Sequence, residues 1–393
     1  MATATQTTRT DSPTVDFALS EEQLLLRGEV RRFSEERIRP GAADRWFSHE
    51  FPSDVLAEMG EMGLLGMMVE EEHGGAGFDP LSYVLAVEEL AVGCPAIAGT
   101  MSVTNSVCCW PIAHFGDDQL KRRVLPALAG GETLGGFGLT EPGSGSDAGS
   151  LATRAERDGD FWVLNGEKAW ITNAGHAGYY VVMAKTDPDA GKRGISAIVV
   201  PADAPGLTIG ERERKMGLHA SVTAPLVFQD CRVRADNLLG REGNGFKIAL
   251  ATLDHSRLGI AAQAVGIHRR ALELSVAYAR ERHQFGVPIA QHQAIQFKLA
   301  TMATELAAAR LLTYRAAAAE GDADGGRLAS EAKLYASEAA NRACYEAVQI
   351  HGGNGFSDDY EVSRLYRDVR VTTIYEGTSE MQRWVISRHL LRA

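Results

Sequence analysis

The sequence predicts a mainly α-helical protein with a central antiparallel β domain. Apolar residues recur at helical spacing in both end regions, whereas tight-turn dipeptides and short β-rich runs replace that pattern in the middle. No helix-length pattern separates the β-rich runs, which argues against a parallel Rossmann sheet. The 393 residues exceed what one hydrophobic core usually accommodates. We expect a disordered tail (1–16), a helical domain (17–133), a β domain (134–236) and a C-terminal helical bundle (237–393).

The first helical region begins at Ser20, which can form a capping box with Gln23 because each side chain can satisfy a free backbone N–H group. Pro40-Gly41 closes this segment, since proline interrupts helical hydrogen bonding. A second helix is expected to begin at Pro52, and a longer helical pattern continues through residues 81–93.

The middle region is expected to form an antiparallel meander, a small sandwich or barrel. Asp158-Gly159 and Asn165-Gly166 are dipeptides that favour tight turns, and the second is expected to separate two strands. The β-rich runs are residues 161–164, 169–172, 179–184, 195–200 and 224–228.

The helical pattern of apolar residues returns near residue 243 in long alanine-rich stretches. They cover roughly 245–282, 291–319 and 327–351, and shorter helices are expected near 360–368 and 379–390. Long helices joined by short links favour a bundle, here a four-helix bundle.

Composition narrows the function. The formal charge of −11 disfavours a nucleic-acid or anionic-membrane binder, because such proteins rely on basic surfaces. No apolar run approaches the roughly 20 residues that span a bilayer. The N-terminal residues lack the apolar core of a secretory signal. Five cysteines without a CxxC pair argue against disulfides and zinc, so we expect no metal site and a cytoplasmic location.

Common catalytic signatures are absent, including HExxH, GxSxG and the Walker loop. Residues 143–148 match GxGxxA, but a dinucleotide fingerprint must follow a strand and open a helix, and β texture follows here. A Gly/Ser-rich loop can still present backbone N–H groups to an anionic or amide-rich ligand. Alternatively, it only joins the helical and β domains.

Five motifs resemble the acyl-CoA dehydrogenase family and occur in the family's order. They are GFGLTEPGSGSD (136–147), GEKAWITN (166–173), RHQFG (282–286), QIHGGNG (349–355) and IYEGTSE (374–380). The resemblance extends over nearly the whole chain and is strongest to the short-chain and short/branched-chain subgroups. It implies the helical–β–helical architecture, with FAD as the cofactor.

The resemblance implies an FAD site with two parts. Trp170 and Thr172 are expected beside the isoalloxazine ring, and an aromatic wall suits a planar cofactor. Arg282 corresponds to a group at the pyrophosphate, which a guanidinium fits, although an isolated arginine is more often a solvated surface charge. The segment from Gln349 comes from a neighbouring subunit in the family. The expected cofactor-binding residues are Phe137, Leu139, Thr140, Gly145, Ser146, Trp170, Ile171, Thr172, Arg282, Gln293, Gln349, Ile350, His351, Gly352, Gly353, Thr378, Ser379 and Glu380.

Glu376 is the expected catalytic base by the same resemblance. It would remove an α-proton from an acyl thioester while a β-hydride leaves for flavin N5, giving a trans-2-enoyl-CoA. An ordinary glutamate is a weak base, so burial that raises its pKa would improve the match. Some relatives carry the base just before the arginine of the segment that here reads LDHSR (253–257), but this chain has Ser256 there.

Substrate contacts are expected from Ser146, Asp254, Arg257 and Gly377. Asp254 and Arg257 would contact the CoA moiety, or they could form an i,i+3 ion pair on a helix surface. His255 either lines the acyl cavity or is a packing residue. Trp110 either shortens that cavity or belongs to the core.

Electron-transferring flavoprotein is the acceptor that the resemblance implies, and a homotetramer built as a dimer of dimers is the implied assembly. Three rival functions remain on the same fold: an acyl-CoA oxidase, a flavin monooxygenase and a catalytically silent CoA-binding protein. Oxidases are commonly longer, monooxygenases usually lack the glutamate of IYEGTSE, and a silent protein would be colourless.

Overall fold

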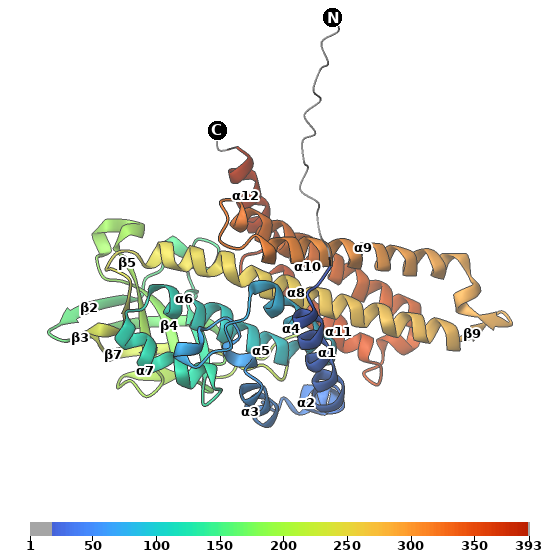
Figure 1. Cartoon of the computed structure of the whole chain (residues 1–393), viewed down its shortest axis with the longest axis horizontal. Coiled ribbons are helices and arrows are strands. Elements are labelled where there is room, and N and C mark those ends of the chain that lie inside the picture. Colours follow the sequence, from blue (N-terminus) through green and yellow to red (C-terminus); the bar gives the residue numbers. More distant parts are fainter. Residues whose placement is uncertain (1–17, 392–393) are drawn as a thin grey trace, which may run out of the picture.

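The computed structural model describes residues 18–391, so the expected tail over 1–16 lies outside them. The chain forms a helical part, a β part and a second helical part in that order (Figure 1). The sheet occupies one end of the molecule, and long helices extend from it toward a small hairpin at the other end (Figure 1). The predicted fold class, mainly α with a central β domain, is confirmed.

The first part contains seven α-helices within residues 18–133 of the described chain. Their bounds are α1 (Glu21–Phe33), α2 (Ala42–Ser48), α3 (Ser53–Glu61), α4 (Pro80–Gly93), α5 (Pro95–Val103), α6 (Trp110–Phe115) and α7 (Asp118–Ala129). The predicted capping box is confirmed, because the Gln23 N–H donates to Ser20 Oγ at 3.1 Å and the Ser20 N–H donates to Gln23 Oε1 at 3.0 Å. Helix α3 begins directly after Pro52, as expected.

The β part is one eight-stranded sheet. Its strands are β1 (Leu134–Gly138), β2 (Arg154–Asp158), β3 (Phe161–Thr172), β4 (Ala177–Lys185), β5 (Ile195–Pro201), β6 (Leu207–Ile209), β7 (Thr223–Arg234) and β8 (Leu238–Leu239). Their order is β6-β7-β3-β2-β4-β5-β8, with β1 paired to β4. The middle of strand β4 is apolar because its two faces pack into different cores, Tyr180 and Val182 into one, Val181 and Met183 into the other.

Two details of the predicted sheet are wrong. The sheet is not purely antiparallel, because β1 runs parallel to β4. Asn165-Gly166 does not separate two strands either, since β3 continues through it with a shift of register against β7. Gly166 has φ 144°, and a Cβ there would lie 2.7 Å from Thr153 Cα. A bulge and a turn both need glycine for such a backbone, so the dipeptide alone does not distinguish them.

The last part contains the helices α8 (Gly245–Glu281), α9 (Gln293–Ala318), α10 (Gly325–His351), α11 (Glu361–Val369) and α12 (Ser379–Leu390). The expected ranges agree with these bounds to within two residues. The short strands β9 (His283–Gln284) and β10 (Val287–Pro288) form the hairpin between α8 and α9. Helix α8 is 37 residues long and therefore about 55 Å in length.

A buried ionic cluster joins α4 to three other helices. Glu88 accepts hydrogen bonds from Arg269 on α8 at 2.9 Å and from Arg310 on α9 at 2.7 Å. Glu89 accepts one from Arg31 on α1 at 2.8 Å. Breaking such a network by removing one partner leaves a buried charge unpaired, so it fixes the relative position of the helices.

All five cysteines are free and buried. Among the helices within residues 18–391, none is both long and apolar enough to cross a bilayer.

Candidate active site

Glu376 lies in a strained loop between a 3-10 turn (Arg370–Thr373) and α12. Its φ is 51°, in the left-handed region that costs a non-glycine residue roughly 1–3 kcal/mol. Gly377 follows with φ 94°, and a Cβ there would lie 2.7 Å from Gln382 Nε2. Because the chain retains this conformation at a glutamate, other contacts must hold the loop in place.

The carboxylate of Glu376 has few hydrogen-bond partners, although charged groups lie nearby. Its Oε2 atom is buried and has no hydrogen-bond partner among the described residues. Burial raises the pKa of Glu376 to about 7, while the nearby Ser256 hydroxyl and the charges of Lys333 and Arg257 act in the opposite direction. A carboxylate with this pKa can accept a proton near neutral pH.

Arg257 and Asp254 form an ion pair on α8, and the Arg257 guanidinium also donates to Ser330 Oγ at 3.1 Å. The arginine is buried, whereas the carboxylate side chain of Asp254 is 45% exposed. The ion pair is therefore present, but it is not an ordinary surface pair. It places a fixed positive charge beside Glu376 and an accessible carboxylate next to it.

An aromatic stack lies beside the base. The His255 ring is 4.9 Å from that of Trp110 and 6.3 Å from that of Tyr83, nearly parallel to both. Its Nδ1 pairs with Glu320, and its Nε2 is buried without a partner. Burial raises the pKa of Tyr83, and the negative charge of Glu376 raises it further, which places the phenol close to the base. His255 therefore joins Trp110 to the surroundings of Glu376.

The first flavin-type segment connects β1 to β2. Phe137 is half-buried and Leu139 is buried, whereas Gly145 and Ser146 are exposed. Glu141 fixes this segment to β3, because Lys168 Nζ lies 2.6 Å from its carboxylate, and both groups are buried. Burial lowers the pKa of Lys168 to about 8.

The second flavin-type segment is the C-terminal half of β3. Trp170 is 60% exposed and has φ 63°, so the strand turns its indole outward. Ile171 is buried in the sheet core, and Thr172 pairs with Thr223 of β7. The neighbouring Thr140 accepts a hydrogen bond from the Ala169 N–H at 2.9 Å, which brings the two flavin-type segments together.

Arg282, Gln293 and the segment 349–353 gather at the opposite end of α8, whereas Thr378, Ser379 and Glu380 lie at the start of α12. Arg282 follows the last residue of α8. The QIHGGNG segment packs beside it, since the His351 ring stacks on Tyr278 at 4.1 Å and Asn354 Nδ2 donates to the Tyr278 hydroxyl at 3.0 Å. Gln293, Gln349, Gly352 and Gly353 are exposed, and Ile350 is buried.

Within one chain, the residues around Glu376 and the residues expected at the FAD diphosphate lie far apart. Asp254 and Arg257 lie in the first half of α8 and Arg282 at its end, about 40 Å apart along the helix. That separation exceeds the length of one dinucleotide.

The residues at each end are suited to FAD. The exposed indole of Trp170 offers apolar area to a planar ring. Ser379 Oγ is buried without a partner at the start of α12, after the helix cap Thr378, and Glu380 is exposed. At the other end, Arg282 is exposed beside glycines around which a Cβ would meet nothing within 4 Å.

Sequence reasoning missed the residues that support these groups: Tyr83, Glu141, Lys168, Gln263, Glu320, Lys333 and Gln382. Four of them, Lys168, Gln263, Lys333 and Gln382, carry amine or amide groups and yet are fully buried. A lysine within an apolar helical stripe was the available signal for Lys333, but its partner is 44 residues away.

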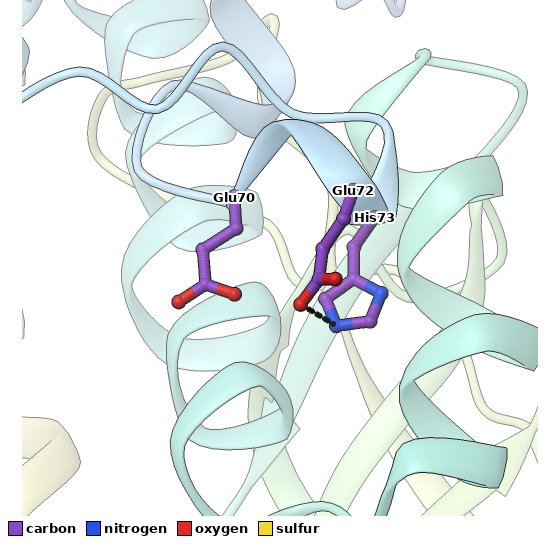
Figure 2. A group of neighbouring side chains, drawn as sticks. All are labelled: Glu70, Glu72 and His73. Carbon is purple, nitrogen blue, oxygen red and sulfur yellow. Dashed lines mark ion pairs between the residues drawn. The ribbon is translucent and has the colours of Figure 1, made fainter.

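A separate cluster lies on the 3-10 turn Glu71–His73. Figure 2 shows Glu70, Glu72 and His73, with Glu72 Oε1 3.6 Å from His73 Nε2. Both glutamates are exposed, so a weak solvated ion pair accounts for this arrangement.

A helical–β–helical fold that combines a glutamate whose Oε2 is buried and unpartnered within residues 18–391 with two flavin-type segments defines a class of protein, the flavin-dependent oxidoreductases. Models of the acyl-CoA dehydrogenase N-terminal, middle and C-terminal domains match residues 20–132, 136–231 and 243–391. The chain therefore belongs to the acyl-CoA dehydrogenase family and is an FAD-dependent oxidoreductase.

Individual relatives agree with this assignment. The chain is 49% identical to the mitochondrial short-chain specific acyl-CoA dehydrogenase of Rattus norvegicus over 376 residues, 95% of this chain and 91% of the relative. The butyryl-CoA dehydrogenase of Megasphaera elsdenii superposes with a TM-score of 0.94 at 44% identity, covering 96% of this chain and all of the other. A chain from a structure described as the electron transferring flavoprotein of Acidaminococcus fermentans gives 0.95, also at 44% identity, with the same coverage.

Chain length does not separate dehydrogenases from oxidases. A prolyl acyl carrier protein oxidase superposes with a TM-score of 0.92 at 34% identity, covering 95% of this chain and 100% of its own. An acyl carrier protein oxidase can therefore have the length of this chain, and the expectation that acyl-CoA oxidases are commonly longer stays a prediction.

Proposed function

We propose that the protein dehydrogenates a short or short-branched acyl-CoA to the trans-2-enoyl-CoA, with Glu376 as the base. The observation that carries the proposal is the buried, unpartnered Oε2 of a glutamate whose pKa is raised to about 7. A rival base before Arg257 would need a carboxylate at the position that Ser256 occupies.

Different residues would serve proton transfer, substrate binding and FAD binding. Glu376 accepts the α-proton at Oε2, which is buried and has no hydrogen-bond partner among the described residues. Asp254 and Arg257 provide polar contacts for the CoA moiety, and Ser146 and Gly377 adjoin the thioester. Bound FAD supplies the acceptor for the β-hydride. Trp170 and Thr172 would hold its ring, and Arg282 of another copy its diphosphate.

Short substrates suit the aromatic stack beside the base. Trp110 is held against His255, and His255 adjoins Ser256 next to Glu376. A bulky, stacked indole at this place limits how far an acyl chain can extend. The high identity to a short-chain specific relative supports the same substrate class.

Trp110→Ala tests the length limit. We expect the ratio of kcat/KM for octanoyl-CoA over butyryl-CoA to rise by about tenfold or more, because methylene discrimination is worth about 1–3 kcal/mol per group. Trp384→Ala, which removes an exposed indole on α12, is the control and should leave the ratio unchanged. An unaltered ratio in the Trp110 variant would place the end of the cavity elsewhere.

The pH profile tests the state of the base. Only the deprotonated carboxylate accepts a proton, so a pKa near 7 predicts that kcat/KM for butyryl-CoA falls about tenfold per pH unit below that value and levels off above it. Rates from pH 5.5 to 8.5 measure this fall, which we call the acid limb of the pH profile. A profile that stays flat down to pH 5.5 would contradict a desolvated base.

The decisive experiment is an anaerobic visible spectrum titrated with butyryl-, isobutyryl-, 2-methylbutyryl- and octanoyl-CoA. Bleaching of the flavin band by a short thioester supports the proposal and reports acyl preference. Bleaching by octanoyl-CoA alone would overturn the substrate class, and no bleaching by any thioester would overturn the reaction. Reoxidation in air as fast as turnover would favour the oxidase.

We propose that a complete FAD site takes residues from both ends of α8. At least two copies would then contribute to each site, and a homotetramer would contain two such pairs. A groove of about 580 Å³ between α9, α10 and α11, bordered by Phe297, Tyr345 and Tyr366, gives copies an aromatic surface to share.

Electron-transferring flavoprotein is the proposed acceptor. Five free, buried thiols fit a reducing compartment, and we place the protein in the cytoplasm.

A further inference from the structure

The loop that carries Glu376 is fastened from behind by two fully buried polar side chains. Lys333 on α10 donates from Nζ to the Gly377 carbonyl at 2.7 Å. Gln382 on α12 donates from Nε2 to the same carbonyl at 2.8 Å and to the Glu376 carbonyl at 3.2 Å. Both side chains have no exposed surface. We call Lys333 and Gln382 the clamp.

The clamp acts at the strained point of the backbone. Glu376 and Gly377 both have positive φ, and their two carbonyls point toward the clamp. The peptide bonds are trans, so the N–H groups of Gly377 and Thr378 point the opposite way. Within the described chain these two N–H groups have no acceptor. The left-handed conformation of Glu376 thus depends on hydrogen bonds to its own carbonyl and the next one.

We propose that Lys333 and Gln382 are positioning residues for the base, holding the strained Glu376–Gly377 backbone so that the carboxylate is presented for proton abstraction. This inference rests on the proposed function, because it assumes that Glu376 is the base. Neither residue needs to touch the substrate. Lys333 has a second effect: its positive charge lowers the pKa of Glu376, whereas burial raises it.

The charges around the base come from three helices and can be separated by substitution. Lys333 on α10 and Arg257 on α8 favour the charged carboxylate, as does the Ser256 hydroxyl. Tyr83 on α4 and Tyr375 in the loop are neutral phenols whose pKa values the Glu376 charge raises further. Burial lowers the pKa of Lys333 to about 8, while the carboxylates of Glu376, Glu338 and Glu380 act in the opposite direction. Gln382 carries no charge.

Two substitutions distinguish position from charge. Lys333→Met removes one hydrogen bond and the positive charge, so we expect kcat to fall about 10- to 100-fold with little change in KM, and the acid limb of the pH profile to move to higher pH. Gln382→Met removes the other hydrogen bonds without a charge, so kcat should fall while the limb stays in place. Arg232→Met, which breaks an exposed ion pair with Asp158 on the sheet, is the control.

The measurements are made on the FAD-loaded enzyme with butyryl-CoA: kcat, KM, the pH profile, the rate of anaerobic bleaching and the flavin absorbance per chain. Normal kcat and an unmoved limb in both clamp variants would overturn the inference. If Lys333→Met does not fold, Gln382→Met decides alone. A lower kcat at full flavin content supports the inference, and an unchanged kcat overturns it. Glu376→Gln is run beside them, because full activity in that variant overturns the proposed function instead.

Discussion

Glu376→Gln is expected to bind FAD normally and to lose about 10²–10⁴-fold in turnover, because the amide is isosteric but cannot accept the α-proton. The flavin band should persist, whereas butyryl-CoA should bleach it only slowly under anaerobic conditions. Stopped-flow bleaching isolates this step from reoxidation. The effect should appear in kcat far more than in KM, because the lost proton transfer belongs to the chemical step rather than to substrate binding.

Glu156→Gln is the matched control, because Glu156 is an exposed glutamate on β2. It should retain full activity. If Glu376→Gln turned over at a near-normal rate, the base would lie elsewhere, and His255 with its free Nε2 would be examined next.

Two inactive variants are expected to restore activity when their subunits mix. Arg282→Glu should repel the FAD diphosphate, and Glu376→Gln should lack the base. In a mixed pair, one site combines an intact Glu376 with an intact Arg282 from the other chain, whereas the second site carries both defects. Random pairing predicts that about a quarter of all sites are fully wild type.

The experiment requires the two variants to be co-expressed with different tags and purified through both. Activity per flavin in the mixed protein is compared with that of each variant alone. Recovered activity supports a site built from two copies. If the mixed protein stayed as inactive as the separate variants while containing both chains, the half-sites would not be shared between subunits.

Much of the fold was predictable because local signals were consistent with it. The capping box at Ser20, the break after α8 and the long alanine-rich helices all reflect interactions between residues near in sequence. Strand pairing was less accessible. Asn165-Gly166 has the composition of a turn but forms a bulge, because the pairing of β3 with β7 continues across it.

In the candidate site, too, local motifs could be read from the sequence, whereas contacts between distant segments could not. Motifs identified Glu376, Trp170 and Arg282, but the clamp comes from α10 and α12, and the Glu320 partner of His255 lies in the turn after α9. No local pattern could join Lys333 to Gly377, since their contact depends on how α10 packs against the last loop. Nor could spacing reveal that Arg282 lies about 40 Å along α8 from Arg257 until the helix was seen to be continuous.

The five buried cysteines have a practical consequence for studies of this protein. Burial raises the pKa of Cys231 to about 11 and that of Cys108 to about 12, so the folded chain holds few reactive thiolates at neutral pH. They lie in all three parts of the fold, from Cys94 to Cys344. Alkylation by iodoacetamide is therefore governed by opening of the chain. The rate of thiol labelling gives every variant a built-in measure of local unfolding that needs neither substrate nor flavin.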